Sequence, residues 1–229
     1  MTGLIEGHTV QRYDGELNQV HALVLKLGRL AREQLLEALG AFEKRDPGKA
    51  NRIVASDREI DELEVETDRE IAALIARRSP VGRDLRMVLA LSKSASDLER
   101  VGDEAARIAG LVLQIFGNEG NNDPGSGLVR DVRRMGTIAL EGLDHALKAL
   151  ADWDAETALR VLEGQGEIDE EFQSGLRRLM TFVIEDARNV GFVIQVVLAI
   201  KSLARVGHYT QNLAEYVVFQ VKGEDLRGA

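Results

Sequence analysis

Two pairs of carboxylates stand four residues apart along the chain: Asp57 with Asp61, and Glu99 with Asp103. On a helix, residues four apart lie on one face with Cβ atoms about 5–6 Å apart, where like charges repel. Two such pairs on neighbouring helices would converge on one patch of oxygen ligands, which suits a hard or borderline cation. The alternative is a solvated acidic face whose charges are neutralised by nearby arginines. The arginines closest in sequence are Arg58, Arg100 and Arg107.

The carboxylates belong to a sequence that repeats itself. Residues 98–109 return as residues 203–214 with five of twelve positions identical, and the segment 59–62 returns unchanged at 167–170. Conserved order and spacing indicate two tandem copies of one helical unit. The second copy departs from the acidic pattern at three of four positions, and it reads Gln165, Asp169, Ala204 and His208. We therefore expect any cation in the first half, with Asp169 and His208 as weak or lost equivalents.

A second cluster of charged residues surrounds the turn at Pro80. Arg83, Asp84 and Arg86 follow this turn, and two further arginines precede it. Guanidinium groups bind carboxylate and phosphate groups, so the three residues could form a docking surface for an acidic partner. The alternative is that these cations stabilise a helix C-terminus and form ordinary salt bridges.

The sequence offers little for catalysis. None of the four histidines has a glutamate three residues before it, so the Glu-x-x-His element of di-iron bundles is missing. Neither a His-Glu-x-x-His motif nor a phosphate-binding loop occurs. We predict that the protein is not an enzyme. A metal-dependent enzyme or a metal-storage protein built on the acidic cluster remains the alternative.

Helical periodicity governs nearly the whole chain. Between residues 85 and 116, apolar residues and small glycines recur at steps of three and four, which predicts a long helix with one buried stripe. Prolines, glycines and polar clusters divide the chain into six helices. The expected helices cover about 9–44, 48–78, 83–117, 128–152, 154–184 and 187–222. The prediction is an all-α fold of two tandem three-helix bundles with a pseudo-twofold repeat, spanning 1–116 and 128–229 with a Gly-rich linker at 117–127.

Composition restricts the location and the partners. The net charge of −9 opposes binding to nucleic acid, which requires clustered cations. Cysteine is absent, and no basic patch followed by an apolar run marks a signal peptide. The longest uncharged stretch, 189–200, is too short to span a bilayer. We expect a cytoplasmic protein without direct membrane insertion.

Two long motifs carry a family resemblance. Residues 74–86 read LIARRSPVGRDLR, residues 97–103 read DLERVGD, and 205–217 repeat the ending of the second motif. In these motifs, and over roughly His8 to Asp225, the sequence resembles the PhoU family, regulatory proteins of bacterial phosphate uptake. The resemblance implies two three-helix bundles that bind iron or zinc through Glu/Asp-x-x-x-Asp pairs. In this chain those pairs are Asp57 with Asp61 and Glu99 with Asp103.

The resemblance also implies partners and a role. The partners are the ATPase subunit of the phosphate ABC transporter, a phosphate-sensing histidine kinase, and a second copy in a homodimer. The role is negative control of phosphate uptake and of the phosphate-starvation response. A helical scaffold that shares the fold without the phosphate role is a further alternative.

Overall fold

The computed structural model describes residues 11–117 and 126–223, and these residues form helices without any strand. The all-α prediction is confirmed. The first half contains four helices and the second half repeats them, with a short 3-10 helix, η1, added before the last. In chain order they are α1 (Gln11–Lys44), α2 (Pro47–Ser56), α3 (Arg58–Arg78), α4 (Gly82–Phe116), α5 (Ser126–Asp152), α6 (Ala155–Glu163), α7 (Gln165–Glu185), η1 (Ala187–Asn189) and α8 (Val190–Lys222).

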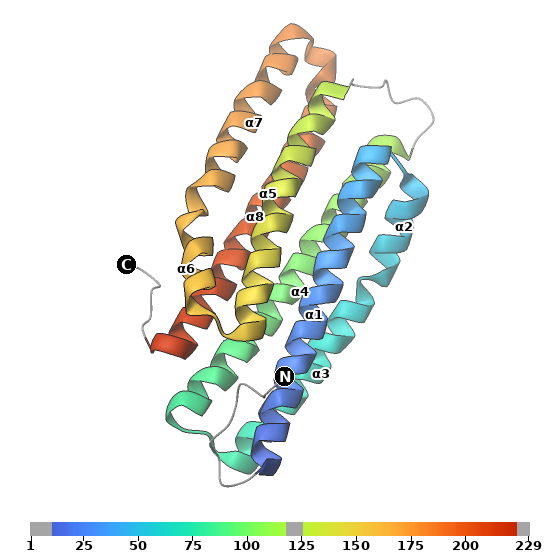
Figure 1. Ribbon diagram of the computed structural model, residues 1–229. Helices are drawn as coiled ribbons and strands as arrows, with labels where there is room; N and C mark the ends of the chain where they lie inside the picture. Colours follow the sequence, from blue (N-terminus) through green and yellow to red (C-terminus); the bar gives the residue numbers. More distant parts are fainter. Residues whose placement is uncertain (1–10, 118–125, 224–229) are drawn as a thin grey trace.

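The two halves lie side by side and share one core. Figure 1 shows the first half, from α1 to α4, next to the second half, from α5 to α8. Helix α1 packs against α5 and α4 packs against α8, while the pairs α2/α3 and α6/α7 cover the outer sides. Leu27 and Leu98 of the first half and Met135 and Leu203 of the second are fully buried in the same apolar cluster. The apolar stripes of both halves are therefore buried largely against each other.

The predicted second and fifth helices are each broken. The structure places the first break at Asp57, between α2 and α3, and the second at Gly164, between α6 and α7. The hydroxyl of Ser56 donates to the Ile53 carbonyl oxygen at 3.0 Å, an interaction that bends helices. Gly164 has low helix propensity and takes a non-helical ψ of 2°. Sequence periodicity did not reveal the breaks because the apolar pattern continues through both.

Helix ends match between the halves. Asp46 accepts a hydrogen bond from the Lys49 backbone N–H at 2.9 Å, and Asp154 accepts from Glu156 N–H at 2.9 Å. Each cap follows a residue with positive φ, Arg45 at 53° and Trp153 at 51°. Asp154 therefore caps α6 as Asp46 caps α2.

The ends of three predicted helices differ in detail from the structure or lie outside the part that it describes. Residues 9–10 of the expected first helix and 118–125 of the expected linker lie outside the described residues. Helix α5 begins at Ser126, two residues before the prediction. Leu85, expected in the buried stripe, is 37% exposed because it lies in the first turn of α4, at the end of the bundle.

Reciprocal glycine contacts set the distance between α1 and α5. A Cβ atom on Gly28 would lie 2.4 Å from Leu147 Cδ2, and one on Gly136 would lie 2.6 Å from Leu39 Cδ2. Gly136 and Leu147 stand 108 positions after Gly28 and Leu39, so each half supplies one glycine and one leucine to the same pair of contacts. The paired contacts therefore follow the pseudo-twofold symmetry of the repeat. They also let α1 and α5 approach more closely than any side chain at the two glycine positions would permit.

A buried carboxylate fixes the register of α4 on α8. Asp97 is 2% exposed, and its Oδ2 accepts hydrogen bonds from Tyr216 Oη at 2.8 Å and Asn212 Nδ2 at 3.1 Å. Its Oδ1 accepts from Arg100 Nη1 at 3.0 Å. The contact between α4 and α8 is therefore polar at these four residues. A shift of one helix by one turn would leave the buried Asp97 charge without its hydrogen-bond donors.

Replacing Asp97 by Ala should therefore cost about 2–3 kcal/mol of unfolding free energy, because the buried donors lose their acceptor. Denaturant unfolding monitored by circular dichroism measures this. Asp144→Ala is the matched control: it removes the exposed pair between Arg32 and Asp144, whose side chains are 35% and 47% exposed. An exposed pair contributes less than about 1 kcal/mol. Equal losses in the two variants would contradict the register role.

One helix meets the length and composition expected of a membrane span. The segment Ala187–Lys222 has an apolar window of mean hydropathy 1.7, but half of that window is buried in the fold. A core helix of an all-α bundle meets the same criteria, so this observation carries little weight for a membrane segment.

Candidate metal centre

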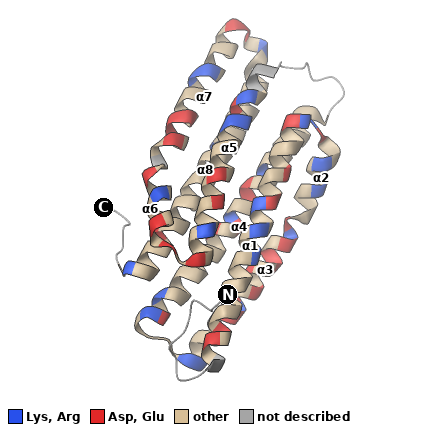
Figure 2. Ribbon diagram, viewed as in Figure 1, with Lys and Arg blue, Asp and Glu red and all other residues tan. Residues whose placement is uncertain are grey.

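Three of the four predicted acidic residues converge. Carboxylate oxygens of Asp57, Asp61 and Asp103 lie within 4.8 Å of one another, with Asp57 half-buried and the other two exposed. Asp57 lies at the break between α2 and α3, Asp61 one turn further in α3, and Asp103 on α4. Figure 2 shows acidic residues along α3. The fold thus brings Asp57 and Asp61 together with one member of the second pair, Asp103, while Glu99 is not among the three.

Glu99 lies beside these three carboxylates, and the charges of two of them raise its pKa. Burial, followed by the charges of Asp103, Glu64 and Asp61, raises the pKa of Glu99 to about 7. Burial likewise raises the pKa of Asp57 and of Asp103, and Asp61 is the leading charged neighbour that raises it further at Asp103. The site therefore holds more negative charge than its surroundings compensate, as expected of a site that a cation would complete.

The arginines expected to neutralise the cluster pair elsewhere. Arg58 binds Glu62 at 2.7 Å, Arg100 binds Asp97 at 3.0 Å, and Arg107 binds Glu104 at 3.3 Å. Arg107 thus pairs with its neighbour on α4 rather than with Asp103, although the charges of Arg100 and Arg107 still lower the pKa of Asp103 slightly. Among the residues that the structure describes, none of these three arginines forms an ion pair with Asp57, Asp61 or Asp103.

Two residues near the cluster were not identified from the sequence. Gln34 of α1 is buried and donates a hydrogen bond from Nε2 to Asp57 Oδ1 at 2.8 Å, which orients that carboxylate. Glu64 has a raised pKa because of burial and the charges of Asp68 and Asp61. Glu64 follows Asp61 by three residues, so helical spacing could have revealed it. Gln34 comes from a separate helix, and nothing in its local sequence marks it.

Close contact between α3 and α4 brings the ligands together. A Cβ atom at Gly102 would lie 2.9 Å from Ile60 Cδ1 and 3.7 Å from Asp57 Oδ1. The repeat preserves this contact, since a Cβ atom at Gly207 would lie 2.8 Å from Ile168 Cδ1. The glycine of the repeated Arg-Val-Gly motif therefore serves helix packing in both halves, and it positions carboxylates only in the first.

The second half keeps the contact between Gly207 and Ile168, but Asp169 is the one carboxylate left at the four corresponding positions. Asp169 Oδ1 lies 4.0 Å from His208 Nε2, and both side chains are about half exposed. Among the described residues, no third acid or histidine joins them in a cluster. The side chain of Gln165 lies outside the described residues. The counterparts of Gln34 and Glu64 are Gly142 and Phe172, so the supporting groups have changed as well as the ligands.

The cluster around the Pro80 turn is divided. Arg83 is exposed, whereas Asp84 and Arg86 are half-buried. Asp84 accepts a hydrogen bond from Tyr13; burial and then Asp84 raise the pKa of the Tyr13 hydroxyl to about 12. The Arg86 guanidinium packs on Gly223 at the C-terminus of α8, 3.7 Å from where a Cβ atom would lie. Of the three residues predicted for docking, Arg83 is thus the most accessible.

The pKa of Glu99 gives a prediction for the metal-free protein. A raised carboxyl pKa adds stability that is fully present below the ordinary value of 4.5 and is lost as the pH rises through about 7. Glu99→Gln should therefore stabilise chelator-treated protein at pH 8 by about 1–2 kcal/mol, after allowance for solvent screening. At pH 4.5 the advantage should shrink to near zero. Thermal unfolding at both pH values measures it, and a pH-independent difference would contradict the assignment.

Comparisons with known proteins match the chain in both halves. The family model for the PhoU domain matches residues 24–112 and 132–217, once in each half. A phosphate-specific transport system accessory protein PhoU homolog of Pseudomonas aeruginosa is 35% identical over 220 residues, covering 96% of this chain and 89% of the relative. The corresponding protein of Escherichia coli is 30% identical with the same coverage of both chains.

Solved structures show the same fold. The crystal structure of PhoU from Pseudomonas aeruginosa superposes with a TM-score of 0.88 at 33% identity, covering 93% of this chain and all of the other. The phosphate transport system regulatory protein PhoU from Streptococcus pneumoniae gives a TM-score of 0.84 at 28% identity, covering 93% of this chain and 99% of the other. The match in both halves, the near full-length identity and the shared fold show that the chain belongs to the PhoU family.

Proposed function

We propose that this protein is an accessory protein of phosphate-specific transport that represses phosphate uptake and the phosphate-starvation response when phosphate is plentiful. The observation that carries the proposal is similarity over nearly the full chain to proteins named as accessory proteins of the phosphate-specific transport system. The proposed partners are the ATPase subunit of the phosphate ABC transporter and a phosphate-sensing histidine kinase. The protein would act in the cytoplasm as a helical adaptor and without catalysis.

Deletion of the gene in its native host tests the regulatory role. We expect a reporter of phosphate-starvation genes to be derepressed in high-phosphate medium, and expression of the intact gene from a plasmid to restore repression. Unchanged reporter expression in the deletion strain would contradict the role in repression, whichever partner is involved.

A cation at Asp57, Asp61 and Asp103, with Glu99 nearby, would connect α3 to α4 and relieve their mutual repulsion. Iron and zinc are the proposed ions, and the ion would be confined to the first half. A ligand can change the activity of an adaptor only if it binds two states of the protein with different affinities. The proposed role of the ion is therefore to stabilise one arrangement of α3 against α4.

Metal storage or metal-dependent catalysis is the second candidate, and the acidic cluster is the observation that favours it. The clustered groups are carboxylates, and the described residues place no histidine among them to act as a general base. Assays of metal-loaded protein for peroxide or oxygen turnover separate the candidates. A regulator should show no turnover above free metal.

A homodimer is proposed through the exposed apolar side of α7 and α8. Ile184 is 82% exposed and Ile194 is 52% exposed, with Val190 and Leu198 one turn before and after Ile194. Large apolar surfaces of this kind usually mark interfaces. Light scattering gives the solution mass, and a monomer at high protein concentration would exclude this interface.

Arg83 is the residue best placed for contact with an acidic partner. Arg83→Ala together with Arg86→Ala should weaken recovery of the histidine kinase or the transporter ATPase in a pull-down, because two cations are lost at the Pro80 turn. Loss of the exposed Arg83 side chain usually changes stability by less than about 0.5 kcal/mol. Circular dichroism checks that loss of the half-buried Arg86, which packs on Gly223, leaves helicity unchanged. Arg52→Ala on α2 is the control for loss of an exposed arginine. Undiminished recovery of both partners would reject this surface.

A further inference from the structure

A groove follows the seam between α1 and α5. It contains a cavity of about 470 Å³ near Leu25 and Leu147 and a smaller one of about 170 Å³ near Phe42 and Val132. Leu36 lines both cavities and is 46% exposed. The groove therefore presents apolar surface to solvent over much of the seam.

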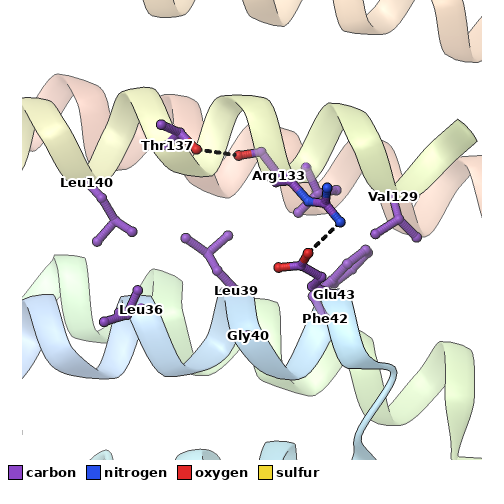
Figure 3. Close-up of a pocket in the computed structure, with 10 residues that line it drawn as sticks. Leu36, Leu39, Gly40, Phe42, Glu43, Val129, Arg133, Thr137 and Leu140 are labelled. Atoms are coloured by element: carbon purple, nitrogen blue, oxygen red, sulfur yellow. Dashed lines mark hydrogen bonds and ion pairs between the residues drawn. The ribbon is translucent and has the colours of Figure 1, made fainter. Parts of the chain in front are cut away.

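Figure 3 shows the smaller cavity. Leu36 and Leu39 of α1 point toward α5, and Leu140 of α5 points back toward α1. Arg133 and Glu43 form an ion pair across the seam at one end. Their charges compensate each other, so this cavity is an apolar chamber with a neutral rim.

The two cavities are counterparts in the internal repeat. At an offset of 108 positions, the α1 wall of one cavity corresponds to the α5 wall of the other, and the reverse also holds. The chemistry has diverged between them. Where the smaller cavity has Thr137 and Gly40, the larger has Arg29 and Lys148. The fold thus provides one aliphatic and one cationic version of the same groove.

Three cations line the larger cavity: Arg32 is paired across the seam, and Arg29 and Lys148 stand on opposite walls. Arg32 of α1 binds Asp144 of α5 through two hydrogen bonds of 2.7 and 2.9 Å, which sets the antiparallel register of the seam. By that register, Arg29 and Lys148 lie across the groove from each other. Both are exposed, and neither forms an ion pair with another residue in the described parts of the chain. Glu33 also lines the cavity, so the walls carry an excess of one positive charge in a protein of net charge −9.

We propose that this seam binds a single-chain amphipathic anion. Its carboxylate or phosphate head would lie between Arg29 and Lys148, and its aliphatic chain would pass Leu36 toward the apolar chamber. A volume of a few hundred Å³ with apolar walls and a few placed polar groups is typical of small-molecule sites. Arginine and lysine are the usual partners of such heads. The proposal does not depend on the phosphate role or on a bound metal.

Isothermal titration calorimetry with dodecyl phosphate below its micelle concentration tests the proposal. We expect saturable binding with one site per chain. Dodecanol, which lacks the head, and inorganic phosphate, which lacks the chain, should each bind at least about tenfold more weakly, because head and chain contacts are both required. Tight binding of inorganic phosphate alone would overturn the proposal in favour of a simple anion site.

Variants locate the site. Arg29→Thr with Lys148→Ala, which gives the larger cavity the uncharged character of its counterpart, should weaken dodecyl phosphate binding at least about tenfold. Arg52→Ala with Lys201→Ala removes the same charge from α2 and α8 and should leave binding unchanged. Leu36→Gln should weaken binding of dodecyl phosphate while leaving the weak binding of inorganic phosphate unaffected. Circular dichroism and thermal unfolding establish that each variant is folded.

Two further outcomes would overturn the inference. One is equal affinity in the Arg29/Lys148 variant and the Arg52/Lys201 variant, which would place the amphiphile elsewhere. The other is binding to vesicles containing an anionic phospholipid without binding to free dodecyl phosphate, which would indicate a membrane-docking surface rather than a site for a single molecule.

Discussion

Replacing Glu99 by Ala and Asp103 by His should remove most of the metal from protein purified without chelator or a metal-affinity tag. The two changes give the first half the residues of the second at these positions. Asp103 is one of the three converging carboxylates, and Glu99 adds charge beside them. Fewer anionic oxygen ligands mean weaker binding of a hard cation. Elemental analysis of iron and zinc per chain measures the effect.

The second half supplies the control for that experiment. Asp169 is exposed and lies 4.0 Å from His208, and no third acid or histidine in the described parts of the chain joins them in a cluster. Asp169→Ala should therefore leave the metal content nearly unchanged. Gln34→Ala should give an intermediate loss, because Asp57 keeps its carboxylate and loses the group that orients it. Equal loss from the Asp169 variant and the double variant, or full occupancy in the double variant, would show that the site has been misplaced.

The second large effect concerns the seam between the halves. Gly28→Leu should lower the free energy of unfolding by about 3 kcal/mol or more, because the new side chain must occupy space filled by Leu147. Gly136→Leu should do the same against Leu39. Denaturant unfolding measures both, and the double variant should separate the halves further or fail to fold.

Two variants make this result specific. Gly15→Leu on the same helix should cost nothing, since a Cβ atom there meets no heavy atom within 4 Å and leucine has the higher helix propensity. Adding Leu147→Ala to Gly28→Leu should restore part of the lost stability by vacating the contested space. A loss at Gly15 as large as that at Gly28 would mean that the effect does not arise from the seam.

The sequence alone was sufficient for the helical fold class and for the repeat, but not for the breaks at Asp57 and Gly164. Helical periodicity and the correspondence of residues 98–109 with 203–214 are local patterns. The spacing of apolar residues reflects the geometry of the helix itself, so it predicts helices without knowledge of the tertiary structure. The divergence of Glu99 and Asp103 into Ala204 and His208 is also a property of the sequence, and it directed the metal proposal to one half.

Only the tertiary structure decided what these residues contact. It assigned Arg107 to Glu104 rather than to Asp103, added Gln34 from a third helix, and left Arg83 more accessible than Arg86. It also showed that Gly28 and Gly136 each receive a leucine from the other half. The contacts of Gln34, Gly28 and Gly136 depend on the packing of helices that are distant in sequence, which no local pattern reveals. Spacing along one helix fixes which face a residue occupies, and the neighbouring helices fix what that face meets.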